Sequence, residues 1–179
     1  MPNWCDTTYT VTGEKDKVKQ LYDLIMKLNK QSGDLWMGDI SYALGGTEED
    51  TARGWVYGID ELSQDGNQFT FYCNTAWGEP SEWRYFVESH ANVSIFYTAI
   101  EPGFDVYLTN DNEYLGKYII DDDTDGQEYP YSKQEVIDIV NDRYEQHCET
   151  IEDCIKFAKQ FSDNEDDKFL FINQFIDGE

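Results

Sequence analysis

Apolar and polar residues alternate along six short stretches of the chain, which is the pattern of half-buried β-strands. The first stretch, residues 5–13 (CDTTYTVTG), is rich in β-branched residues and ends at a glycine. The other five stretches lie at residues 53–60, 68–77, 93–102, 104–111 and 113–120. We predict a strand in each of them, with a tight Asn-Asp-Asn turn between the last two.

Two further stretches repeat their apolar residues every three or four positions, which is typical of amphipathic α-helices. Residues 14–30 (EKDKVKQLYDLIMKLNK) form the first, and Gly33 follows as a stop signal. Residues 79–91 form the second, with Pro80 near the first helical position. A helix is therefore expected at each place.

The predicted order up to residue 100 is β-α-β-β-α-β, which indicates an α+β fold with a ferredoxin-like antiparallel sheet. Residues 33–52 are interpreted as a loop with a short strand at Ile40–Leu44. The strands at residues 104–111 and 113–120 are expected to extend the sheet by a hairpin. Residues 1–120 would then be one domain, and residues 121–179 an acidic helical region and tail docked on it.

The helical region has an acidic side and an apolar side. Ser132-x-x-Glu135 is a capping box, which predicts a helix start. One long helix, or two nearly collinear helices with a break near Thr150, would place apolar residues from Ile137 to Ala158 in one stripe. The acids on the other side follow one another at three or four residues: Glu135, Asp138, Asp142, Glu145, Glu149 and Glu152.

The net charge of the chain is -24, with 37 acidic and 13 basic residues. Direct binding of nucleic acid or of an anionic membrane is disfavoured, because those ligands need Lys and Arg to neutralise phosphates. The expected partner is a basic protein surface, in particular that of a nucleic-acid-binding protein. No apolar run approaches the length of a membrane-spanning helix, so we expect a cytoplasmic protein of a bacterial host cell.

Two interpretations of the acidic row remain open. It is either the solvated side of an amphipathic helix or a surface that imitates nucleic acid. On one helix, successive carboxylates would be about 5 Å apart along the axis, comparable to phosphates on a strand. Residues Asp121–Asp125 and Asp163–Asp167 would flank the row.

A second candidate site lies at one end of the predicted sheet. Antiparallel pairing of the first and third strands would bring together Trp4, Cys5, Cys73, Trp77 and Trp83. This group predicts either a pocket for a flat ligand or a closely packed sheet end. Phe69 and Phe71 could also offer stacking faces, as in RNA-binding sheets, although few basic residues surround them. No nucleophile and base can be singled out, so an enzyme is not indicated.

A half-motif for calcium precedes the helical region. Asp121, Asp123 and Asp125 alternate and Gly126 follows, as in the first half of a calcium-binding loop. The twelfth position, where a bidentate Glu is needed, is Ser132. The segment therefore predicts either a weak calcium site or an acidic turn, and no other cofactor is expected.

The chain begins Met1-Pro2-Asn3-Trp4-Cys5, and a strand ending at Gly13 follows. Later come Thr-Ala-Trp, with Pro80 three residues on, and the segment Ala-Ile-Glu-Pro-Gly-Phe-Asp-Val-Tyr. In these features residues 1–120 resemble the YubB ferredoxin-like family, whose members begin MPNWC and are carried by plasmids, phages and integrated elements. The resemblance implies a ferredoxin-like fold and a mobile-element origin, and it implies no reaction.

Two functions follow as expectations. The first is a non-enzymatic acidic protein of a phage or plasmid that mimics nucleic acid or inhibits a host enzyme of DNA or RNA handling or defence. The alternative is a small-molecule-binding domain or small enzyme that uses the Trp- and Cys-rich sheet end.

Overall fold

The computed structural model describes residues 3–104, 106–122, 130–164 and 169–178. The chain divides into two compact units. Unit 1 comprises Met1–Asp111 and Gly178–Glu179, and unit 2 comprises Asn112–Asp177. The division falls before the predicted boundary at residue 120, and unit 2 is an insertion in the chain of unit 1.

Unit 1 contains six strands of an antiparallel sheet, in the order β2-β3-β4-β1-β5-β6. Their bounds are β1 (Trp4–Thr12), β2 (Leu35–Trp36), β3 (Gly54–Ile59), β4 (Gln68–Ala76), β5 (Ser94–Glu101) and β6 (Val106–Thr109). The helices are α1 (Lys15–Ser32), α2 (Met37–Ala43) and α3 (Ser81–Ala91), with short 3-10 turns η1 (Glu48–Asp50) and η2 (Pro102–Phe104). The α+β prediction is therefore confirmed.

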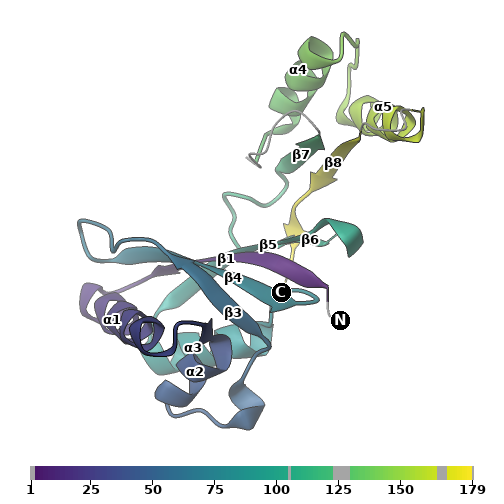
Figure 1. Ribbon diagram of the computed structural model, residues 1–179. Helices are drawn as coiled ribbons and strands as arrows, with labels where there is room; N and C mark the ends of the chain where they lie inside the picture. Colours follow the sequence, from purple (N-terminus) through teal and green to yellow (C-terminus); the bar gives the residue numbers. More distant parts are fainter. Residues whose placement is uncertain (1–2, 105, 123–129, 165–168, 179) are drawn as a thin grey trace. The chain divides into compact units, whose positions relative to one another are not determined.

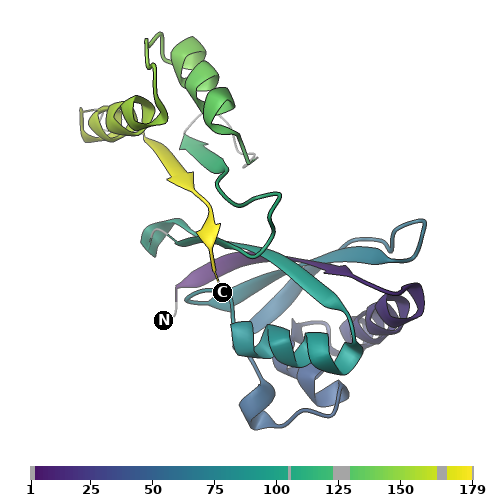
Figure 2. The same ribbon diagram turned by 180° about the vertical axis from the view of Figure 1, so that it is seen from behind.

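All three helices of unit 1 lie on one side of the sheet (Figure 1) and remain together in the reverse view (Figure 2). Strand β1 shows why: Cys5, Thr7 and Tyr9 are buried, whereas the residues between them are not. Side chains of a strand point alternately to the two faces, so one face of β1 packs against the helices and the other is left open. The core lies between that face and the helices.

The short strand predicted at Ile40–Leu44 is wrong, because these residues belong to helix α2 and its C-terminal end. The Asp39 carboxylate accepts a hydrogen bond from the Trp36 backbone N–H (3.2 Å), which satisfies a donor at the helix start. Met37 and Ile40, three residues apart, are both fully buried on the inner side of the helix. Helix α2 is therefore stabilised by its cap and by tertiary packing.

Unit 2 contains a two-stranded antiparallel sheet of β7 (Tyr118–Asp122) and β8 (Leu170–Gln174). Helices α4 (Lys133–Arg143) and α5 (Ile151–Asn164) pack on it around a separate apolar core. A two-residue strand, β9 (Ile176–Asp177), precedes Gly178, where the chain re-enters unit 1. In the described part of the chain, no helix combines the length and apolarity that crossing a lipid bilayer requires.

The predicted hairpin between residues 104–111 and 113–120 is wrong, because β6 joins the sheet of unit 1 whereas β7 pairs with β8. Tyr118, Ile119 and Ile120 are all buried, so β7 needs apolar cover on both faces. Tyr118 and Ile120, on one face of β7, pack in the apolar core of unit 2, together with Leu170 and Ile172 of the paired strand. Strand β7 thus contributes to the core of unit 2 and does not form a hairpin with β6.

Of the two arrangements expected for the helical region, one long helix is wrong, whereas two helices with a break next to Thr150 are present. Helix α4 ends at Arg143, and Glu145 takes a left-handed conformation (φ 52°). The Asn141 side chain then bonds both backbone groups of Cys148, at 2.7 and 2.9 Å. Thr150 and Asp153 form a new cap for α5, with 3.0 Å between the Thr150 nitrogen and the Asp153 carboxylate. Helices α4 and α5 are not in line in either view (Figures 1 and 2).

The apolar stripe expected from Ile137 to Ala158 consequently does not run as one line. Helix α4 buries Val136 and Val140. Helix α5 buries Ile151, Cys154 and Ala158, whereas Ile155 is exposed, because each helix sets its own phase.

Candidate functional site

The six acids of the predicted row are all exposed, but they lie on three different segments. Glu135, Asp138 and Asp142 are on α4, at spacings of three and four residues that place them on one face. Glu145 and Glu149 lie in the connection between the helices, and Glu152 is in the first turn of α5. A continuous row at constant pitch therefore does not form.

These carboxylates are not neutralised by neighbouring cations. Among the described residues, none of the six takes part in an ion pair within 4 Å. Glu135 accepts hydrogen bonds from the Ser132 hydroxyl (2.7 Å) and backbone N–H (2.8 Å), which lower its pKa. Asp138 accepts a bond from the Gln134 amide (2.8 Å). Hydrogen bonds, and not close ion pairs, are therefore the contacts recorded for Glu135 and Asp138.

Arg143, the last residue of α4, pairs with Asp122 and not with an acid of the row. Its guanidinium pairs with Asp122 at 2.5 Å, and the Tyr144 hydroxyl donates to the same carboxylate at 2.9 Å. The Asp122 side chain is almost fully buried, so it needs these partners. The arginine nearest the acidic face therefore serves the interior of unit 2.

The flanks of the row are only partly described. Asp163 is exposed on α5, and Asp121 is half-buried on β7, where burial and then the neighbouring Asp122 raise its pKa. Asp123, Asp125 and the segment 165–168 lie outside the described residues. Within the described residues, no three His, Cys, Asp or Glu side chains gather as metal ligands. The calcium site at Asp121, Asp123 and Asp125 stays a prediction.

The sheet-end group splits between the two faces of the sheet. Cys5, Cys73 and Trp83 are buried on the helix side, where the Trp83 indole N–H donates to the Met37 carbonyl at 3.0 Å. Trp4 lies on the other face, because it alternates with Cys5 along β1, and Trp77 is 63% exposed. The five residues therefore do not all lie on the same face of the sheet, and Cys5, Cys73 and Trp83 form part of a closely packed core.

Both cysteines of β1 and β4 are poor nucleophiles. Burial raises the pKa of the Cys5 thiol to about 11, although hydrogen bonds from Thr7 and Thr75 act in the opposite direction. Burial also raises the pKa of Cys73, and the charge of Asp6 adds to this effect. Because the thiolate is the reactive form, these residues serve as small core side chains.

What the open face does assemble is a group of four tryptophans and one arginine, which we name the indole cluster: Trp4, Trp36, Trp55, Trp77 and Arg53. Trp4 meets Trp55 edge to face with ring centroids 4.3 Å apart, and Trp55 meets Trp36 at 6.0 Å. The Arg53 guanidinium lies 5.9 Å from the Trp4 ring and 5.8 Å from the Trp77 ring. The cluster links four chain segments.

Sequence reasoning missed Trp36, Trp55 and Arg53. Trp36 and Trp55 are partners in the register of β2 and β3, so they share a face. In β3, Gly54 and Val56 are buried and Trp55 is not, but the sequence Gly-Trp-Val has no polar–apolar alternation that would have marked Trp55 as outward-facing. Strand β2 has only two residues and offers no pattern either.

Trp77 is held in an unusual conformation. Its φ is +66°, in the left-handed region that side chains other than glycine rarely adopt. Its backbone N–H donates to the Asn3 carbonyl at 2.9 Å, which ties the end of β4 to the start of β1. The backbone thus directs a large apolar ring into solvent.

The segment after Trp77 is anchored by a buried ion pair. The Glu79 carboxylate receives the Arg84 Nε–H at 3.1 Å and the Tyr9 hydroxyl at 3.3 Å. Only 2–3% of the Glu79 and Arg84 side chains is exposed. Burial raises the pKa of Glu79, while the adjacent Arg84 acts to lower it. This pair fixes the turn from β4 into α3.

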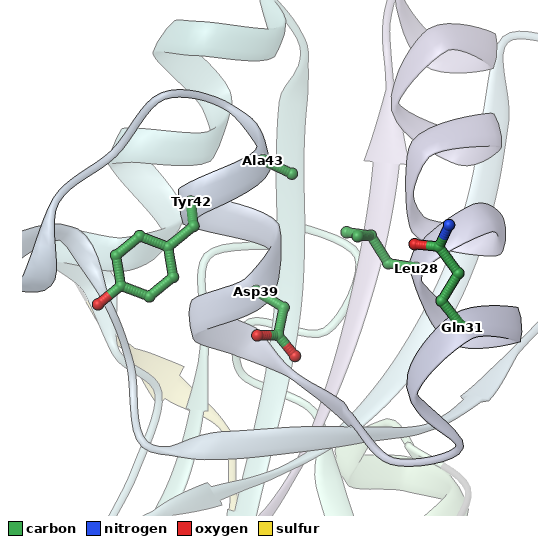
Figure 3. A pocket seen from close by; sticks show the side chains of 5 residues that line it. All are labelled: Leu28, Gln31, Asp39, Tyr42 and Ala43. Atoms are coloured by element: carbon green, nitrogen blue, oxygen red, sulfur yellow. The ribbon is translucent and has the colours of Figure 1, made fainter.

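Two cavities of similar size lie elsewhere. One, of about 430 Å³, is between α1 and α2, where Leu28, Gln31 and Asp39 border the gap (Figure 3). Asp39 is its one titratable carboxylate, and it already bonds the Trp36 N–H. The other, of about 410 Å³, is in unit 2 and includes His147, Cys148 and Lys156. Neither brings a nucleophile and an oriented base into hydrogen-bond contact that the structure records.

No known protein-family model matches the chain, and no curated protein sequence matches it.

Proposed function

We propose that this protein is a non-enzymatic, strongly acidic binding protein of a mobile genetic element. It binds the basic surface of a host protein that handles DNA or RNA, in the cytoplasm of a bacterial cell, and inhibits that protein by occupying its nucleic-acid site. The observation that carries the proposal is the row of six exposed carboxylates in unit 2, none of which forms an ion pair within 4 Å among the described residues.

A surface with unneutralised charge of one sign attracts an oppositely charged protein over a distance, which is called electrostatic steering. It raises the association rate with an oppositely charged partner and weakens as salt screens it. On α4, Glu135, Asp138 and Asp142 also repel one another, since like charges three or four residues apart are unfavourable on a helix. A binding function accounts for this arrangement better than solubility does, because the chain would stay strongly negative without the row.

The array of carboxylates that could mimic a nucleic-acid strand is shorter than it would be on one long helix. Glu135, Asp138 and Asp142 on α4 are about 5 Å apart along the helix axis, which approximates the phosphates of a short stretch of strand. Glu149 and Glu152 form a second acidic group around the start of α5. Two short arrays, joined by a structured connection, would engage two neighbouring basic subsites of the partner.

We propose further that unit 1 is a ferredoxin-like domain of the YubB type. The order β3-β4-β1-β5, with α1 after β1 and α3 after β4, supports the βαββαβ arrangement. The opening Asn3-Trp4-Cys5 and the later Thr75-Ala76-Trp77 carry the resemblance on which the mobile-element origin rests.

The test is an affinity purification from a bacterial lysate at low and moderate salt. The row variant changes Glu135, Glu145, Glu149 and Glu152 to Gln, and Asp138 and Asp142 to Asn. Glutamine can still complete the capping box with Ser132, so the start of α4 is preserved. We expect a nucleic-acid-handling protein to bind the natural chain at low salt and to dissociate from it at moderate salt. The same protein should not bind the row variant.

A matched control carries the same change of charge in unit 1. It replaces six exposed acids by their amides: Asp34, Glu48, Glu49, Glu61, Asp65 and Glu82. This variant should keep the partner. Equal loss of binding in both variants would show that total charge matters and not the row, and undiminished binding by the row variant would exclude the proposal.

A further inference from the structure

We propose that the indole cluster of unit 1 is a second contact surface for the same basic partner, and that it binds arginine side chains by stacking their guanidinium groups on its exposed indoles. This inference rests on the proposed function, since it takes the partner to be a basic protein. It adds a surface that charge alone does not predict.

The cluster already binds one guanidinium. Arg53 of the chain itself lies against two indoles, at 5.9 Å from Trp4 and 5.8 Å from Trp77. These distances are within the range in which a cation is attracted to the face of an aromatic ring. Over Trp36 and Trp55, no cation of the described chain is placed in this way. Arg53 thus covers one face each of Trp4 and Trp77 and leaves the remaining exposed indole surface for a ligand.

The exposure of the cluster has no structural benefit. Trp77 is 63% exposed and Trp36 is 47% exposed, although tryptophan gains much from burial. Trp77 also has a positive φ, which costs an L-residue on the order of 1–2 kcal/mol. A glycine would remove that strain, and a polar residue would remove the exposed apolar surface. Strain and exposure at one residue point to a contact that the isolated chain does not make.

The surroundings favour a cationic ligand over a nucleic acid. Seven of the 13 basic residues lie in unit 1, and five of those seven are on α1. Strands β1 to β6 contain no Lys or Arg. On the open face, Asp6 is exposed and accepts the Tyr57 hydroxyl at 2.7 Å. Aromatic faces beside carboxylates, with a single cation, suit a guanidinium and repel phosphate.

Arginine fits this surface better than lysine. The guanidinium is planar and weakly hydrated, so it can stack on an indole and keep its in-plane N–H groups for a carboxylate. The ammonium of lysine is compact and strongly hydrated, and it loses more on desolvation. The surface should therefore prefer arginine-containing segments.

The experiment measures binding of a short synthetic peptide that alternates arginine with glycine, by titration calorimetry with the full chain. Peptides that carry lysine or glutamine in place of arginine are the ligand controls. The test variant combines Trp36→Ala and Trp77→Gly, and the protein control is Tyr42→Ala, an aromatic of similar exposure (53%) outside the cluster. Circular dichroism confirms that each variant is folded.

We expect the double variant to weaken binding of the arginine peptide about tenfold, because it removes Trp36 and also Trp77, of which Arg53 covers only one face. Tyr42→Ala should leave the affinity unchanged, and the lysine and glutamine peptides should bind more weakly. Arg53→Gln should strengthen binding of the arginine peptide, because it frees the faces of Trp4 and Trp77.

Several results would overturn the inference. These are unchanged affinity in the double variant, equal binding of the lysine peptide, weaker binding after Arg53→Gln, or binding of a neutral oligosaccharide and not of the arginine peptide. The row variant separates the two proposals. If it loses the lysate partner while the tryptophan variant keeps both partner and peptide, only this inference fails. If the tryptophan variant loses the partner and the row variant keeps it, the proposed function fails as stated.

Discussion

Trp77 offers a direct test of the backbone strain in the indole cluster. Two substitutions, Trp77→Ala and Trp77→Gly, remove the same indole and keep the same backbone N–H bond to Asn3. They differ in one respect: alanine must place a Cβ at φ +66°, whereas glycine adopts this conformation freely.

The size of the effect follows from three contributions. Trp77 is 63% exposed, so about a third of its surface is buried, and losing it costs each variant roughly 2 kcal/mol at about 25 cal/mol per Å². The left-handed conformation costs alanine about 1–2 kcal/mol. Glycine gains unfolded-state entropy, which costs it about 0.5–1 kcal/mol. The glycine variant should therefore be more stable than the alanine variant by about 0.5–1 kcal/mol.

The measurement is chemical denaturation followed by tryptophan fluorescence, with the four remaining tryptophans as reporters. An opposite sign is expected at Gln20, an exposed residue inside α1, where glycine should be less stable than alanine by about 1 kcal/mol. If alanine is as stable as glycine at position 77, the positive φ does not store strain and the structural argument for the cluster loses one of its two supports.

Three further outcomes are expected. In the native protein, iodoacetamide should label Cys148 first, because Cys5, Cys73 and Cys154 are buried and have raised pKa values. Mass spectrometry of the labelled peptides gives the order of labelling, and fast labelling of Cys5 would contradict its pKa of about 11. Arg84→Met should lower the free energy of unfolding by about 3–5 kcal/mol, since it leaves the buried Glu79 carboxylate without its ion-pair partner. Urea denaturation measures this loss, and a value below about 1 kcal/mol would contradict a buried ion pair. The hydrogen bonds from Thr150 lower the pKa of Asp153 below its ordinary 3.8, so the charged carboxylate stabilises the folded state above that pH. The difference in unfolding free energy between the natural chain and Asp153→Asn should therefore shrink as the pH falls below 3.8. A difference that grows in acid would refute the assignment.

Several local features could be read from the sequence because they depend on neighbouring residues alone. The capping box at Ser132 and Glu135 forms as predicted, with bonds of 2.7 and 2.8 Å. The alternation in β1 correctly separates its two faces. Thr150-x-x-Asp153 carries a similar capping signal, which favours the second expected arrangement, two helices with a break near Thr150.

The candidate sites depended on the structure to a greater extent. The exposure of the six acids could be predicted, since carboxylates without partners stay in water. Their distribution over α4, the connection and α5 could not, because one side chain, Asn141, holds the connection through bonds to a residue seven positions away. The sheet-end prediction found two members of the indole cluster and mixed them with three residues of the core.

The sequence by itself determined the properties that arise from composition and local periodicity: the excess of acid, five of the six strands and two of the three helices of unit 1, and the start of α4. Tertiary structure alone decided which segments meet. It paired β7 with the distant β8, because the apolar residues of both strands pack in one core with helices α4 and α5. It also assembled the indole cluster from four segments, since strand register, and not distance along the chain, sets which side chains become neighbours.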